Sequence, residues 1–111
     1  MVIHKNEWNW GRSFTFVLYG GSAVITMSIT DDEPLQAFFS GLSVCEPYRK
    51  RRRGTKCLEC AMEQARLEGC KYAYLMADMD SFVFEWYKRR GFRYYGDKPN
   101  ENGVVPMYIE L

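Results

Sequence analysis

The sequence predicts an α/β (α+β) fold in which two helices accompany a mixed, mostly antiparallel sheet, in the order βββ-α-β-α-ββ. Three observations predict it. Residues 14–44 contain three short β-branched and aromatic runs separated by turn residues, which is typical of a strand meander. Residues 54–69 have apolar residues at helical spacing and lead into an apolar run. A second helical segment and two terminal runs complete the 111 residues, enough for a single domain over residues 1–111.

The first half of the chain accounts for the meander. Residues 14–19 and 23–29 are rich in β-branched and aromatic side chains, and a Gly-Gly pair between them indicates a turn. Residues 35–44 form the third predicted strand, in which Gly41 is expected to interrupt the pairing as a bulge. Turns this short join neighbouring antiparallel strands.

The second half of the chain changes character. The helix predicted over residues 54–69 has apolar residues at i, i+3, i+4 and i+7, and Gly69 is placed to end it. The apolar stripe consists of Leu58, Ala61, Met62 and Ala65. Residues 71–77 are apolar at both odd and even positions, which predicts a central strand covered on both faces.

A second helix and a strand pair close the chain. Asp80 and Ser81 are candidates for its N-cap, and Gly91 is placed to end it. The terminal strands are predicted over residues 92–95 and 104–111, around a polar loop.

Composition and charge exclude several classes of protein. Fifteen Lys and Arg residues against fourteen Asp and Glu give a net charge of +1, which argues against a dedicated nucleic-acid-binding domain. No run approaches the roughly 20 apolar residues that cross a bilayer. The first residues also lack the apolar core of a signal peptide. We therefore expect a cytoplasmic protein without a membrane partner.

The four cysteines stand at positions 45, 57, 60 and 70, and they are expected to be thiols because no export signal is present. Cys57 and Cys60 form a CxxC pair, which raises the question of a metal. A structural zinc site needs about four ligands, whereas the chain has one histidine and no second CxxC pair. We expect no metal and interpret both cysteines as packing residues of the first helix.

One third of the basic residues stand consecutively, from Arg49 to Arg53, immediately before Gly54 and Thr55. A helix that begins here presents unpaired backbone N–H groups and about +0.5 charge, which attract phosphate. Five cationic side chains beside these groups suit a nucleotide-type diphosphate. Neither a Walker loop nor a GxGxxG fingerprint is present. A solvated charged loop or a nucleic-acid patch stays open as an alternative.

Two motifs make the chain resemble the GCN5-related N-acetyltransferases (GNAT), which bind acetyl-coenzyme A. The basic run is similar to their pyrophosphate signature Q/R-x-x-G-x-G/A, with Arg49 at the first position, Gly54 at the last and Arg52 at the middle glycine. A glycine permits a positive φ there, whereas a Cβ costs about 1 kcal/mol. Either the loop changes shape slightly while Arg52 adds a charge, or the affinity for the cofactor is reduced.

The second motif lies in the predicted second helix. The segment Asp80-x-x-Val83-x-x-x-Tyr87-x-x-x-Gly91-Phe92 resembles the family signature N-x-x-A-x-x-x-Y-x-x-x-G-F. Asp80 stands in place of the usual Asn, and Val83 in place of the usual Ala. The resemblance covers roughly residues 13–111.

The resemblance implies an acyl-CoA N-acyltransferase-like fold and an acetyl-CoA-dependent N-acetyltransferase, in which an amine of the acceptor attacks the thioester directly. It implies that the third strand parts from the central strand near residues 41–44 and exposes backbone groups to the pantetheine arm. An N–H around Val44 or Cys45 then polarises the thioester carbonyl, and Tyr87 protonates the departing sulfur. The implied cofactor-binding residues are Leu42, Val44, Arg49, Lys50, Arg51, Arg52, Arg53, Gly54, Thr55 and Asp80.

The acceptor side is less defined. Glu33, Glu46 and Asp78 stand at predicted strand ends as candidate general bases, and many family members use a water chain instead. Family members usually carry a first strand and two helices that build much of the acceptor pocket. About a dozen residues precede Ser13 here, so we expect a short member that lacks this strand and these helices. We expect a pocket open to a small-molecule or protein amine, or completed by a second subunit in a homodimer. A non-catalytic CoA-binding or protein-interaction module is the alternative, and a nucleic-acid-binding domain a further one.

Overall fold

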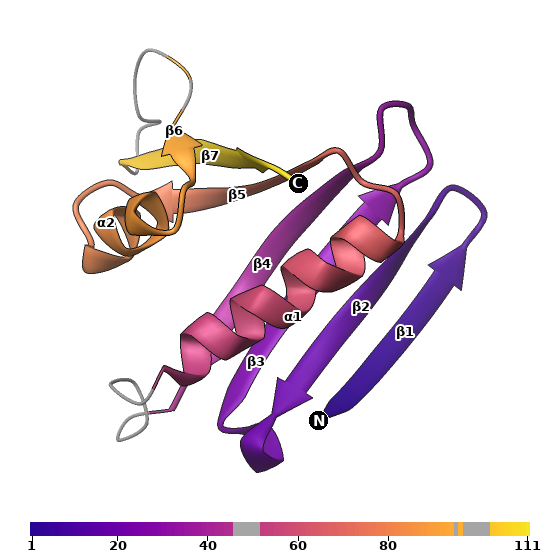
Figure 1. Ribbon diagram of the computed structural model, residues 1–111, viewed down its shortest axis with the longest axis horizontal. Coiled ribbons are helices and arrows are strands. Elements are labelled where there is room, and N and C mark those ends of the chain that lie inside the picture. Colours follow the sequence, from indigo (N-terminus) through magenta and orange to yellow (C-terminus); the bar gives the residue numbers. More distant parts are fainter. Residues whose placement is uncertain (46–51, 95, 97–102) are drawn as a thin grey trace.

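The computed structural model describes residues 1–45, 52–94, 96 and 103–111. In this part of the chain, seven strands form one sheet in the order β1-β2-β3-β4-β5-β7-β6 (Figure 1). β4 and β5 are parallel, and the other neighbouring pairs are antiparallel. The strands are β1 (Val2–Trp8), β2 (Gly11–Leu18), β3 (Ala23–Thr30), β4 (Gln36–Val44), β5 (Tyr72–Asp78), β6 (Arg93–Tyr94) and β7 (Val104–Glu110). The helices are η1 (Tyr19–Gly21), α1 (Arg53–Leu67) and α2 (Phe82–Arg89).

The predicted fold class is confirmed, but the chain has one strand more than predicted. β1 pairs with β2 along its whole length, from Val2 opposite Val17 to Trp8 opposite Gly11. The expectation that the first strand is missing is therefore wrong, although no helix precedes β2. β1 was not predicted because it is an edge strand whose residues are exposed up to Trp8. Such a strand needs no apolar alternation, since its hydrogen bonds to β2 hold it in place.

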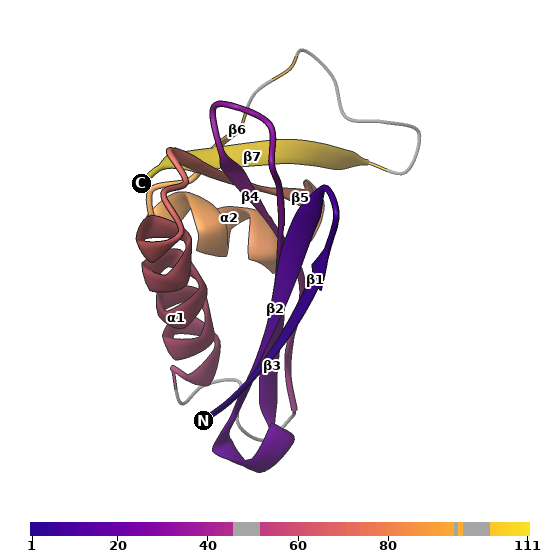
Figure 2. The same cartoon turned by 90° about the vertical axis from the view of Figure 1, so that its right-hand side faces the viewer.

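Both α-helices cover the same face of the sheet (Figure 2). Ala37 of β4 and Ala73 of β5 are paired across the parallel ladder, and both are fully buried. α1 packs on β2, β3 and β4, whereas α2 packs on β5. α1 therefore lies on the β4 side of the boundary between β4 and β5, and α2 lies on the β5 side.

β5 is an interior strand, as predicted, but only one of its faces is covered. Ala73, Leu75 and Ala77 point toward the helices and are at most 3% exposed. On the other face Met76 is 47% exposed, and Tyr74 lies against Phe38 of β4 with 4.9 Å between the ring centroids. The prediction of two covered faces is wrong because tyrosine and methionine tolerate a partly wet surface.

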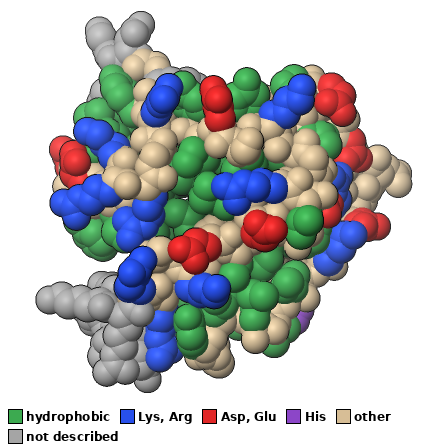
Figure 3. Space-filling model, in the orientation of Figure 1, with side chains coloured by type: hydrophobic (Ala, Val, Ile, Leu, Met, Phe, Trp, Pro, Cys, Tyr) green, Lys and Arg blue, Asp and Glu red, His purple; other side chains and the backbone are tan. Residues whose placement is uncertain are grey.

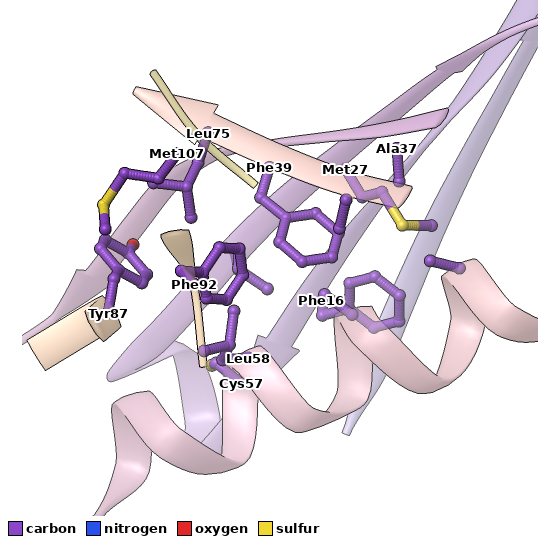
Figure 4. Close-up of a cluster of buried hydrophobic side chains, with 14 of the residues drawn as sticks. Phe16, Met27, Ala37, Phe39, Cys57, Leu58, Leu75, Tyr87, Phe92 and Met107 are labelled. Carbon is purple, nitrogen blue, oxygen red and sulfur yellow. The ribbon is translucent and has the colours of Figure 1, made fainter. Parts of the chain in front are cut away.

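The core lies between this face of the sheet and the two helices. Figure 4 shows side chains from β2, β3, β4, β5 and β7 meeting those of α1 and α2, with Tyr87 among them. Cys57 is fully buried on α1, and burial raises the pKa of its thiol to about 11. The interpretation of Cys57 and Cys60 as packing residues of this helix is confirmed. The described residues contain no group of three or more His, Cys, Asp and Glu side chains placed to hold a metal ion.

Candidate functional site

A cleft of about 610 Å³ opens where β4 and β5 separate. The two strands pair only from Gln36 to Phe38 and from Tyr72 to Tyr74, so they part earlier along β4 than the predicted residues 41–44. The predicted bulge at Gly41 is confirmed: Ile25 of β3 faces two residues of β4 instead of one, and Gly41 has a φ of 62°. The bulge turns the end of β4 away from β5. The cleft is lined by Phe39–Val44 with Ile25, by Leu75–Asp78, by Arg52, Gly54 and Thr55, and by Phe82, Val83, Trp86, Tyr87 and Arg90.

The first turn of α1 forms one wall of the cleft. Arg52 is the N-cap residue and has a φ of 60° and a ψ of 18°, the left-handed conformation that a glycine adopts at little cost. The arginine therefore keeps the backbone conformation that the resemblance assigns to the middle glycine. A Cβ on Gly54 would lie 3.4 Å from Cγ2 of Val44 and 3.6 Å from Cζ2 of Trp86. The missing side chain lets β4 and α2 approach the start of this helix closely.

The structure describes two residues of the basic run, and of these Arg52 lines the cleft whereas Arg53 does not. Arg53 points away from the cleft, where its Nη1 donates a hydrogen bond to Oγ of Ser22 (2.6 Å) and its guanidinium lies 4.4 Å from the ring centroid of Tyr19. It therefore anchors α1 to the turn between β2 and β3. The predicted binding residues Arg49, Lys50 and Arg51 lie outside the described residues, as does Glu46.

Leu42 and Val44 both line the cleft on β4, as the prediction for the pantetheine arm requires. The amide of Cys45 is engaged, because its N–H donates to the carbonyl of Ser22 at 2.8 Å. This hydrogen bond occupies the N–H of Cys45, so the predicted thioester contact by Cys45 is not supported.

Tyr87 lines the cleft from α2 and is 9% exposed. The hydroxyl of Ser81 accepts a hydrogen bond from the N–H of Val83 (3.1 Å), which confirms Ser81 as the N-cap of this helix. The ring of Tyr87 contacts Trp86 and Phe92 edge to face, with centroids 5.1 and 5.5 Å away. Burial raises the pKa of Tyr87 to about 12, so its hydroxyl is protonated at neutral pH.

The two aspartates beside α2 have different positions. Asp78 ends β5 and lines the cleft, and its Oδ1 accepts a hydrogen bond from the backbone N–H of Asp80 (2.9 Å). Asp80 is exposed and does not line the cleft. Glu33 precedes β4, whose opposite end lines the cleft. Of the candidate bases that the structure describes, Asp78 is the one brought to the site.

Arg90 is a cleft residue that sequence reasoning missed. Its guanidinium carbon lies 3.6 Å from the ring centroid of Trp86, and its Nη2 donates to Oγ1 of Thr55 (2.8 Å). Arg90 falls on the same side of the helix as Trp86 and Tyr87, so a basic residue at an apolar position was the signal that could have found it. Figure 3 shows Lys and Arg side chains gathered around a hollow on this side of the molecule.

The comparisons with known proteins point to an acetyltransferase family. The model of the acetyltransferase (GNAT) family matches residues 2–92. The chain therefore belongs to the GNAT acetyltransferase family. No curated protein matches the chain significantly.

Solved structures of acetyltransferases have the same fold. The NatC complex bound to Gag peptide and CoA aligns with a TM-score of 0.73 and 16% identity, over 91% of this chain and 70% of that chain. A putative acetyltransferase from Agrobacterium tumefaciens aligns with a TM-score of 0.71 and 21% identity, over 98% of this chain and 77% of that chain. The Bacillus subtilis acetyltransferase in complex with CoA aligns with a TM-score of 0.66 and 20% identity, over 91% of this chain and 77% of that chain. Among the described residues, neither helix has the length and hydropathy of a membrane span.

Proposed function

We propose that the chain is an acetyl-CoA-dependent N-acetyltransferase that transfers the acetyl group to an amine by direct attack on the thioester. The observation that supports this most is the cleft between β4 and β5, which has the first turn of α1 on one wall and Tyr87 on another. A phosphate-bearing thioester needs an anion-binding end and a proton donor for its sulfur, and the cleft contains residues suited to both.

The first turn of α1 is suited to the diphosphate of the cosubstrate. The first N–H groups of a helix point out of its N-terminal end, where the helix dipole is positive. Gly54 and Thr55 line the cleft at this turn, and Arg52 adds a cation. We assign the diphosphate to Arg52, Gly54 and Thr55, with Arg49, Lys50 and Arg51 as additional proposed contacts. Leu42 and Val44 are the proposed contacts of the pantetheine arm.

Tyr87 is the proposed proton donor. Attack by the neutral amine forms the C–N bond, and collapse of the tetrahedral oxyanion breaks the C–S bond and leaves a thiolate. The hydroxyl of Tyr87 transfers its proton to that sulfur, and its raised pKa keeps it protonated until the thiolate forms. Asp78, which lines the same cleft, is the proposed acceptor of the proton that the amine loses.

Calorimetric titration with CoA and acetyl-CoA, followed by a thiol-release assay on a panel of amines, tests the proposal. Binding together with turnover supports it. Binding without turnover on any amine indicates instead a non-catalytic CoA-binding module on the same fold. The absence of CoA binding contradicts the proposal altogether.

A second copy of the chain is the proposed partner. β1 is a seven-residue strand at the edge of the sheet, and its residues are exposed up to Trp8. An edge strand of this length presents backbone N–H and C=O groups to a partner strand, so antiparallel pairing of two copies is favoured. Sedimentation at increasing protein concentration tests this, and a monomer throughout contradicts it.

A further inference from the structure

Three contacts fix the side chain of Arg90, and one of them is at the start of the other helix. It is the C-cap residue of α2, and its Nη1 donates to the carbonyl of Trp86 at 2.9 Å. Its Nη2 reaches Thr55 in the first turn of α1. The guanidinium also lies over the ring of Trp86, with its carbon 3.6 Å from the ring centroid. Arg90 thus presents a fixed cation to the cleft rather than a freely rotating one.

The electrostatic surroundings of Arg90 are unfavourable without an anion. The N-terminal end of a helix carries about half a positive charge, and Arg90 contacts that end of α1. Arg52 lines the same cleft, and burial together with the charges of Arg52 and Arg89 lowers the pKa of Arg90. Glu59 opposes these charges more weakly. Within the described residues, Arg90 forms no salt bridge with a carboxylate.

Some donors of the guanidinium have no partner among the described residues. Arginine carries five N–H bonds, of which the described residues accept two. Nε of Arg90 is buried and has no hydrogen-bond partner among the described residues. Because Nε is closed to solvent, the donors that can meet a ligand are the remaining N–H groups of Nη1 and Nη2.

We propose that Arg90 binds the phosphate-bearing part of the ligand together with the first turn of α1, and so gives the cleft its preference for a phosphorylated thioester. This inference rests on the proposed function and names a residue that binds the ligand's phosphates. A fork of donors on a rigid stem matches two phosphate oxygens better than a lysine does. α2 therefore carries both the proposed acid, Tyr87, and a phosphate ligand three residues later.

The experiment compares three probes on the full chain: CoA, acetyl-pantetheine, which lacks the phosphates, and inorganic pyrophosphate. Arg90→Gln is expected to weaken CoA binding at least about tenfold, since it removes a charge-assisted contact. The affinity for acetyl-pantetheine is expected to stay within about twofold of that of the wild type. Arg89→Gln is the matched control, because Arg89 is exposed and does not line the cleft. It removes the same charge and is expected to retain most of the affinity for CoA.

Two outcomes of the titrations with Arg90→Gln overturn the proposal. An unchanged affinity of Arg90→Gln for CoA shows that Arg90 does not contact the phosphates. Equal losses for CoA and acetyl-pantetheine show that Arg90 only braces the two helices. If Arg90→Gln does not fold, Arg90→Lys takes its place in the same titrations, and an affinity for CoA equal to that of the wild type overturns the proposal.

The pyrophosphate probe separates this inference from the proposed function. If the wild type fails to bind CoA, the proposed function fails, but the role of Arg90 is still measurable. Pyrophosphate should then raise the melting temperature of the wild type and of Arg89→Gln more than that of Arg90→Gln. An equal rise in all three proteins overturns the inference.

Discussion

Two partly buried arginines, Arg12 and Arg90, have different kinds of hydrogen-bond partner. Arg12 on β2 donates to Oε1 of Glu68 at 2.6 Å and to Oδ1 of Asp31 at 2.8 Å. The hydrogen bond with Glu68 is the main reason why the pKa of Arg12 is raised. Arg90 has a hydroxyl, a carbonyl and a tryptophan ring as partners, and its pKa is lowered.

The difference separates a structural charge from a binding charge. Arg12 joins β2, the end of β3 and the end of α1, so its carboxylate partners come from the protein itself. At the cleft, the described residues supply Arg90 with no such partner, and an anionic ligand can take that place. Substitutions near Arg12 should therefore change stability, whereas substitutions in the cleft should change binding or turnover.

The largest expected effect is on turnover. Tyr87→Phe removes the proposed proton donor, so kcat should fall about 100-fold while CoA affinity and folding are retained. Tyr94→Phe is the matched control, because Tyr94 lies on β6, is 40% exposed and does not line the cleft. Steady-state rates with acetyl-CoA measure both variants. Unchanged turnover in Tyr87→Phe removes this residue from the acid role.

The same tyrosine should make stability depend on alkaline pH. The pKa of Tyr87 is raised from 10.0 to about 12 in the folded state, so the unfolded chain loses this proton first as the pH rises. The folded state keeps its full stability below pH 10 and loses about 2–3 kcal/mol as the pH rises toward 12. Urea unfolding of wild type and Tyr87→Phe at about pH 9 and about pH 11 measures the difference. Parallel losses in both proteins would assign the effect to other groups.

Removal of the structural charge should lower stability and spare binding. Arg12→Met leaves Glu68 and Asp31 without their cation and should lower the free energy of unfolding by about 2 kcal/mol. Lys5→Met breaks the exposed pair with Glu7 and should cost less than about 1 kcal/mol. Chemical denaturation measures both variants. If Arg12→Met also loses CoA affinity, the separation of the two charges does not hold.

The smallest expected effect comes from the backbone of Arg52. Arg52→Gly relieves a left-handed conformation and should raise the free energy of unfolding by up to about 1 kcal/mol. Arg53→Gly is the opposite control, because it weakens the first turn of α1 and removes the contact with Ser22. Urea unfolding measures both, and a loss of stability in Arg52→Gly contradicts the assignment of strain.

Much of the fold could be predicted from short-range patterns. The limits of α1 and α2 follow from apolar spacing and from Ser81, Gly69 and Gly91, which act on their immediate neighbours. The bulge at Gly41 was also predictable, because glycine tolerates the positive φ that such a bulge needs. β1 was not predictable in this way, since its stability comes from its partner strand rather than from its own pattern.

The candidate site could be predicted only in outline. The start of α1, the end of β4 and Tyr87 were found from motifs, and the structure brings them to one cleft. Arg53 was grouped with its neighbours because adjacent residues look alike in sequence, yet its partners are Ser22 and Tyr19 on a distant turn. Arg90 was overlooked for the converse reason, because Thr55 is 35 residues away.

The sequence by itself determined that two helices and a mixed sheet form, where the helices begin and end, and that a basic segment precedes the first of them. These features depend on backbone conformation and hydrophobic spacing, which are set within a few residues. Only the tertiary structure decided which of the described cations line the cleft, because a long arginine side chain takes its direction from the partners it meets. Packing places Arg53 against Ser22 and Arg12 against the carboxylate of Glu68. It places Arg90 beside the positive end of α1.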